Sequence, residues 1–140
     1  MTTFDPEERA LLARLADVLI PAGQGFPSAS EAGVAREGLD QVVSLRPDLA
    51  AGLKQLAAMA RNRDPFELIA CIAETDTSLF GVLTDFVPGA YFLNEQVRVC
   101  LKYAGQTPRP VNPQPDHDDL LQPVLNRGPV YRPTPRNRSR

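Results

Sequence analysis

The sequence is poor in the residues that most catalytic and metal-binding sites use. It contains one histidine, His117, two cysteines and no tryptophan. Zinc sites need a cluster of cysteine, histidine or carboxylate ligands, and the two cysteines do not form a CxxC pair. A serine or cysteine nucleophile needs an adjacent base, and a single histidine leaves little choice of one. We therefore expect no catalytic residue, no metal ligand and no cofactor bound by this chain.

Long apolar runs and an export signal are also missing. No stretch approaches the roughly 18 uninterrupted apolar residues that a membrane-spanning helix requires. The first residues, MTTFDPE, show neither a basic region followed by an apolar stretch nor a pair of arginines. We therefore expect a cytoplasmic protein. The periplasm is the alternative if a signal has been removed or if a partner carries the chain out.

Carboxylates surround the single histidine in the segment Asp116–Asp119. Metal and acid–base sites use such clusters, but a catalytic base must be held within hydrogen-bonding reach of its proton. Because the segment is polar and lies among prolines, we interpret it as a solvated acidic turn. Two further pairs, Glu7 with Glu8 and Glu74 with Asp76, lie one or two residues apart, so their side chains point to different faces of a helix. We interpret them as capping or solvated residues.

The two cysteines, Cys71 and Cys100, each lie among apolar residues within a helical pattern. A chain of 140 residues is long enough to bury a core without a disulfide. Free cysteines are among the most buried residue types. We therefore expect two buried free thiols.

Charge and proline divide the chain into two parts. Residues 1–106 contain nine basic and 14 acidic side chains, whereas residues 107–140 contain six arginines, three aspartates and eight of the 14 prolines. Proline fixes φ and removes a backbone donor, so we expect at most one helical turn in the second part, at Asp118–Leu121. We predict a helical bundle domain over residues 1–106 and an extended, proline-rich, partner-binding arm over residues 107–140. Nucleic acid is not expected as a partner, because the body is acidic and the tail lacks interleaved lysines.

Helix signals dominate the first part of the chain. Asp5 followed by Pro6 predicts a helix start, and apolar residues at 3.6-residue spacing continue the helix to Pro21. A capping box at Ser28–Glu31 predicts a second helix that ends before Pro47.

Four more helices are expected, and sustained strand patterns are absent. A proline and glycine at residues 88–89 predict that the fifth helix ends or kinks there. The expected fold class is therefore all-α, a small bundle of five or six helices with an extended C-terminal arm. The later helices are expected at residues 48–60, 64–73, 75–86 and 94–103.

The arm carries apolar residues that a solvated linker would not need. Ordering the backbone costs about 1–2 kcal/mol per residue, so docking the arm requires an extensive surface. That surface is either the chain's own bundle or another protein, and the small size of the bundle favours another protein. The residues expected to contact the partner are Leu120, Leu121, Val124, Leu125, Val130, Tyr131 and Arg132.

Four short segments occur in order along the chain, at residues 12–22 (LARLADVLIPA), 30–34 (SEAGV), 91–97 (YFLNEQV) and 101–106 (LKYAGQ). Together they resemble the gluconate 2-dehydrogenase subunit 3 family over about residues 8–110. The arm lies largely outside this region.

The resemblance implies a small subunit that accompanies a large flavoprotein dehydrogenase of the glucose-methanol-choline type. The large subunit would hold FAD and oxidise a sugar or another alcohol, and the small one would support its folding, stability or export. No catalytic residue is carried over to this chain. The sequence departs from the family in having no twin-arginine signal, and in having Lys102 and Ala104 where a glycine and a proline are usual.

Two hypotheses of different classes follow. The first is a non-catalytic small subunit that binds and stabilises such a flavoprotein. The alternative is a free-standing helical adaptor that binds an unrelated protein through the arm. A stand-alone enzyme that uses His117 is a remote third.

Overall fold

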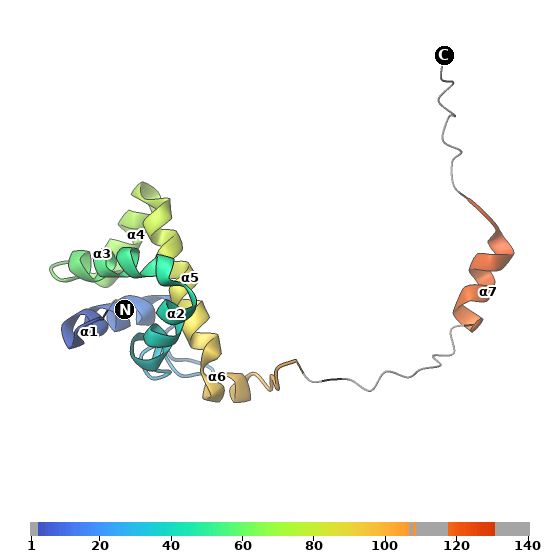
Figure 1. Ribbon diagram of the computed structural model, residues 1–140, viewed down its shortest axis with the longest axis horizontal. Helices are drawn as coiled ribbons and strands as arrows, with labels where there is room; N and C mark the ends of the chain where they lie inside the picture. The colour runs from blue at the N-terminus through green and yellow to red at the C-terminus, as the bar shows by residue number, and fades with distance from the viewer. Residues whose placement is uncertain (1–2, 107, 109–117, 131–140) are drawn as a thin grey trace, which may run out of the picture. The chain divides into compact units, whose positions relative to one another are not determined.

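A computed structural model describes residues 3–106, 108 and 118–130 of the chain. The chain divides into two units, Met1–Gly105 and Gln106–Arg140. The first unit is an all-α bundle, as the sequence predicts, and no β-strand forms within the described residues (Figure 1).

The described part of the bundle contains six α-helices, a π-helical turn and a short 3-10 turn. None of the described helices is both long and apolar enough to cross a lipid bilayer. In chain order the elements are α1 (Pro6–Leu19), η1 (Val34–Gly38), α2 (Leu39–Leu45), η2 (Pro47–Leu49), α3 (Ala50–Ala60), α4 (Pro65–Thr75), α5 (Thr77–Leu93) and α6 (Glu95–Cys100).

The central helix of the bundle is α5. It contacts α1, α2, α3, α4 and α6, and Figure 1 shows it running along the bundle from α4 towards α6. Each of the longer helices presents one apolar stripe to a single core, which is the arrangement that amphipathic helices need. The largest fully buried side chains are Phe86, Leu12, Leu15, Leu39, Leu53, Leu56, Leu68, Ile72, Leu83, Val34, Val87 and Val97.

Side-chain caps begin four helices. The Asp5 carboxylate accepts a hydrogen bond from the N–H of Glu8 at 2.8 Å, and the Glu8 carboxylate accepts one from the N–H of Asp5 at 2.9 Å. Asp64, Asp76 and Asn94 accept backbone N–H groups at the starts of α4, α5 and α6. The sequence-based starts of α1, α4 and α6 are therefore confirmed, as is the interpretation of Glu8 and Asp76 as capping residues.

The predicted second helix is wrong in its first half. The capping box does form, because Glu31 donates its N–H to the Ser28 hydroxyl at 3.3 Å and Ser28 donates its N–H to the Glu31 carboxylate at 2.7 Å. The chain then turns at Gly33, whose φ of +73° lies in the left-handed region, and regular helix begins only at Leu39. An L side chain at residue 33 would be strained at this positive φ, so the turn favours glycine.

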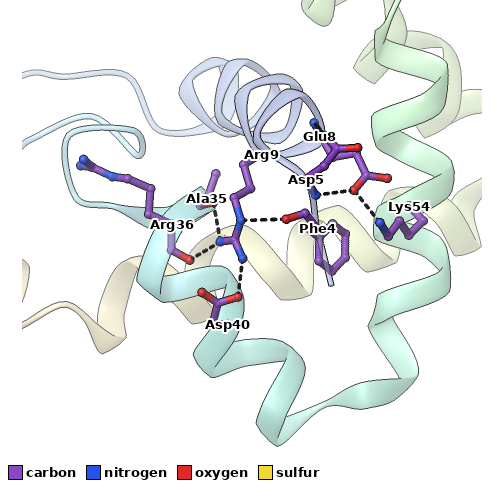
Figure 2. Close-up of polar contacts among 8 residues, drawn as sticks. All are labelled: Phe4, Asp5, Glu8, Arg9, Ala35, Arg36, Asp40 and Lys54. Atoms are coloured by element: carbon purple, nitrogen blue, oxygen red, sulfur yellow. Dashed lines mark hydrogen bonds and ion pairs between the residues drawn. The ribbon is translucent and has the colours of Figure 1, made fainter. Parts of the chain in front are cut away.

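Arg9 stabilises this break from another part of the sequence. Its guanidinium donates to the carbonyl oxygens of Phe4 at 3.2 Å, Ala35 at 3.3 Å and Arg36 at 2.9 Å, and to the carboxylate of Asp40 at 2.6 Å (Figure 2). Arg36 itself has φ −107° and ψ −109°, outside the helical region. The Arg9 guanidinium thus binds two carbonyl oxygens of the interrupted segment. Because Arg9 is distant in the sequence, the residues around the break do not indicate this interaction.

The predicted end of the fifth helix near residue 86 is also wrong. The helix α5 passes through Pro88 and continues to Leu93. Proline removes one backbone hydrogen bond, but Phe86 before it and Ala90 and Tyr91 after it are all buried in the core. Continuing the helix keeps these side chains on the packed face, and packing supplies most of a helix's stability.

The expectation of two buried thiols is wrong, because Cys71 and Cys100 are both exposed. Cys71 lies on α4 beside the stripe that buries Leu68 and Ile72, but not on it. Cys100 is the last residue of α6, which buries only Val97. Apolar neighbours in the sequence indicate that a helix has a buried face, but they do not place every residue on that face.

The second unit contains one described helix, α7 (Asp118–Arg127), orange-red in Figure 1. The prediction of an extended arm with at most one helical turn at Asp118–Leu121 is therefore wrong for these residues. Pro123 lies within the helix and does not end it. The apolar residues around Pro123 have helical spacing, and this pattern outweighs the helix-breaking tendency of the single proline.

A partly buried ion pair connects α1 to α3. The Lys54 ammonium lies 2.5 Å from the Glu8 carboxylate and 4.7 Å from the centre of the Phe4 ring. The side chains of Glu8 and Lys54 are 16% and 34% exposed. The hydrogen bond from Lys54, followed by that from the backbone of Asp5, lowers the pKa of Glu8 below its ordinary value of 4.5.

Replacing Lys54 with methionine is expected to lower the free energy of unfolding by about 1 kcal/mol at neutral pH, since it removes both the ion pair and the cation–π contact. A carboxyl whose pKa is lower in the folded protein stabilises it above its unfolded pKa, and this contribution disappears as the pH falls through the folded pKa. The ion pair's share of the difference in free energy of unfolding between Lys54→Met and the unsubstituted chain should therefore vanish on acidification. Urea unfolding of both proteins at a series of pH values measures this difference.

The matched control is Arg61→Met. Arg61 pairs with Glu7 at 3.3 Å, but both side chains are more than half exposed. Loss of this ion pair should therefore cause almost no change in the free energy of unfolding. A Lys54→Met effect that stayed constant from neutral pH down to about pH 3 would contradict the assigned role of Glu8.

Candidate partner-binding surface

The helix α7 carries its apolar side chains on one face. Leu120, Leu121, Val124 and Leu125 fall within an arc of about 140° at about 100° per residue. Their exposed fractions are 71%, 52%, 53% and 68%. Gln122 lies outside this arc, about 60° beyond Leu125. A row of large apolar side chains that are all more than half exposed is typical of a surface that binds another molecule.

Five of the seven predicted contact residues lie in the described residues. Four are those on α7, and the fifth, Val130, is 67% exposed. Helical spacing brings the α7 residues together on one face, whereas an extended chain would send successive side chains to opposite sides. The other two, Tyr131 and Arg132, lie outside the described residues, as do Asp116 and His117 of the predicted acidic turn. Asp118 and Asp119, the rest of that segment, begin α7.

A second group of exposed apolar side chains lies at the α5–α6 end of the bundle and was not predicted. Phe92, Leu93, Val99, Leu101 and Tyr103 are between 41% and 70% exposed. Only two other large apolar side chains in the described part of the bundle are comparably exposed. A six-residue helix such as α6 has too few positions to bury a full stripe. The sequence offered one signal of this exposed group, namely the short spacing between the helix cap Asn94 and the glycine at residue 105.

The bundle also has a hollow of about 520 Å³ beside α1, lined in part by Ala10, Ala13, Glu31 and Arg36. Arg9 also lines it, and its guanidinium donates hydrogen bonds to three carbonyl oxygens and one carboxylate (Figure 2). These bonds hold the guanidinium in place within the fold. The role of Arg9 is therefore to join the start of α1 to η1 and α2.

A more polar hollow of about 410 Å³ lies where α6 begins. Its lining includes two carboxylates, Glu37 and Glu95, and the guanidinium of Arg98. Asn94 also lines it, but this side chain already donates to the carbonyl of Ala32 and accepts from the start of α6. In the part of the chain that the structure describes, no group of three or more potential ligands is arranged to hold a metal ion.

Residues from three of the short segments noted in the sequence, 12–22, 30–34 and 91–97, meet around the loop at residues 27–34. The Asp17 carboxylate accepts the N–H of Ser30 at 2.7 Å. The Tyr91 hydroxyl and the Asn94 amide donate to carbonyl oxygens of the same loop at 2.7 and 2.9 Å. Burial is the main cause that raises the pKa of Tyr91, so its hydroxyl stays protonated as a donor. These segments therefore hold the loop in place, which gives them a structural role.

The described residues thus form a small all-α protein with a packed bundle and a separate amphipathic helix. No family model, no curated protein and no solved structure matches the chain.

Proposed function

We propose that the chain is the non-catalytic small subunit of an oxidoreductase complex. In this proposal it binds and stabilises a large FAD-dependent dehydrogenase or oxidase of the glucose-methanol-choline type, which acts on a sugar or another alcohol. The observation that carries the proposal is the exposed apolar face of α7. The identity of the partner rests on the resemblance of residues 8–110 to the gluconate 2-dehydrogenase subunit 3 family.

Energetics support a partner for α7. Burying a leucine or valine side chain contributes roughly 1.5–3 kcal/mol, so four of them on one face offer substantial binding energy. Part of that energy is offset by the cost of ordering the arm. The exposed group from Phe92 to Tyr103 on the bundle adds further apolar surface for the same partner.

The proposal predicts that a tagged copy of the chain, expressed in the cells that natively make it, recovers a protein several times its size. The recovered protein should show a flavin absorption band and oxidise a sugar or alcohol. The chain purified alone should be colourless, because FAD would belong to the partner, and free of metal, because its described residues include no cluster of three metal ligands. Absorption spectroscopy, mass spectrometry and metal analysis of the two samples measure these outcomes.

The adaptor alternative predicts a different result from the same experiment. A partner of defined stoichiometry without flavin would contradict the flavoprotein assignment and favour the adaptor. A flavin band or a stoichiometric metal in the chain purified alone would contradict a non-catalytic role. A compact monomer that recovers nothing would contradict both hypotheses.

A further inference from the structure

The arm has two ways to present its apolar residues to a partner, and the structure distinguishes them. In an extended arm Leu120 and Leu121 would point to opposite sides, as would Val124 and Leu125. In α7 all four lie within one arc of about 140°, and Gln122 lies outside it. A single groove can cover the helical face, whereas an extended segment would need apolar surface on both sides.

We propose that α7 is the docking element of the arm and that it binds as a helix, with its apolar face in an apolar groove of the large flavoprotein. The identity of that partner rests on the proposed function. Helix-in-groove binding uses anchors at the spacing that α7 shows, because residues three and four apart share a helix face.

Charge defines one end of the groove. After Asp119 the sequence contains no acidic residue, and its five remaining charged side chains are all arginines, beginning with Arg127 in the last turn of α7. Opposite charges steer association and set the orientation of the bound partner. The groove is therefore apolar along α7 and bounded by carboxylates beyond the C-terminal end of the helix.

An anionic membrane fits this segment less well than a protein groove. Helices that lie on membranes carry lysines and arginines on the polar face. The sequence of α7 contains two aspartates, Asp118 and Asp119, and one arginine, Arg127, so the helix itself is net negative. A protein groove with an acidic margin at one end matches both the helix and the arginines that follow it.

Pro123 couples helix formation to binding. It has no N–H to donate to the carbonyl of Asp119, and proline is the least favourable residue in a helix interior. With ten residues, α7 is also shorter than the roughly 12–15 that make an isolated helix stable in water. The free-energy cost of forming the helix therefore offsets part of the favourable binding energy. Pro123 lies outside the apolar arc, so replacing it changes the helix without changing the face.

The test titrates full-length variants against the flavoprotein recovered with the tagged chain. Pro123→Ala should increase the helical circular dichroism and tighten binding about threefold or more, because less is lost on docking. Leu121→Asp should weaken binding at least about tenfold, since it places a charge in the apolar groove. Gln122→Asp is the matched control, with the same charge change on the neighbouring residue, and should bind within about twofold of the unsubstituted chain.

The outcomes separate this inference from the proposed function. If the tagged chain recovers no flavoprotein, the proposed function fails. If it binds but Pro123→Ala binds equally or more weakly, the arm docks in an extended form and the helical inference is overturned. Two further results would overturn the inference. If the chain floats with phosphatidylglycerol vesicles and Leu121→Asp abolishes this, the apolar face binds a lipid surface. If the chain alone self-associates and Leu121→Asp abolishes this, the face binds a second copy of the chain.

Discussion

Deleting residues 111–140 is expected to weaken binding to the flavoprotein at least tenfold while leaving the bundle folded. The buried core of the described residues lies between Phe4 and Val97, so the deletion removes none of it. It does remove the four apolar side chains of α7, each of which contributes roughly 1.5–3 kcal/mol on burial, before ordering costs. A tenfold change in affinity corresponds to about 1.4 kcal/mol. A tenfold loss therefore requires only part of the burial free energy of these four side chains.

Titration of the truncated chain against the flavoprotein measures the loss, and far-UV circular dichroism with thermal melting measures the fold. The truncated bundle should melt as cooperatively as the full chain. Unchanged affinity would mean that the arm has no part in the complex. An unfolded truncated bundle would mean that residues 111–140 are needed to fold it, which contradicts the separate core.

Smaller changes divide the loss between apolar contacts and charge. Replacing Leu121, Leu125 and Tyr131 together with alanine should reproduce most of the effect of the deletion, because these changes remove three anchors. Replacing the last three arginines with alanine should mainly reduce the salt dependence of binding, because charges outside the centre of an interface steer association more than they add affinity.

Replacing Phe86 with alanine is expected to lower the free energy of unfolding by about 3–5 kcal/mol. Phe86 is completely buried on α5, the helix that contacts all the other α-helices of the bundle. Removing its ring leaves a cavity that the surrounding helices fill only in part. Domains of this size have about 5–15 kcal/mol of stability, so a single change of this kind removes a large share of it.

The control for Phe86→Ala is Phe66→Ala, which makes the same chemical change on α4. Phe66 is 69% exposed, so its loss should change the stability by no more than about 0.5 kcal/mol. Urea unfolding of both variants measures the difference. Equal effects for the two variants would contradict the placement of α5 at the centre of the core.

Several features of the fold follow from local chemistry. The starts of α1, α4 and α6 were predictable because Asp5, Asp64 and Asn94 bond to backbone N–H groups within three residues. The all-α class was predictable because apolar residues repeat at helical spacing through the first hundred residues.

The candidate surface was predictable in part. The apolar residues of the arm, including Leu120 and Leu125, stand out from their polar surroundings in the sequence. Their common helix face was not predictable from the sequence pattern, because Pro123 is a residue type that usually breaks helices. The exposed group from Phe92 to Tyr103 was not predictable either, since exposure depends on what the rest of the chain covers.

Composition, capping residues and apolar spacing thus establish an all-α protein, because each acts within one or two helical turns. Distant contacts establish the rest. Arg9 bonds to carbonyl groups 26 and 27 residues away and supports the break in the predicted second helix, and buried residues on both sides of Pro88 keep α5 continuous. These contacts outweigh local preference, because core packing and several hydrogen bonds together contribute more free energy than the helix propensity of any single residue.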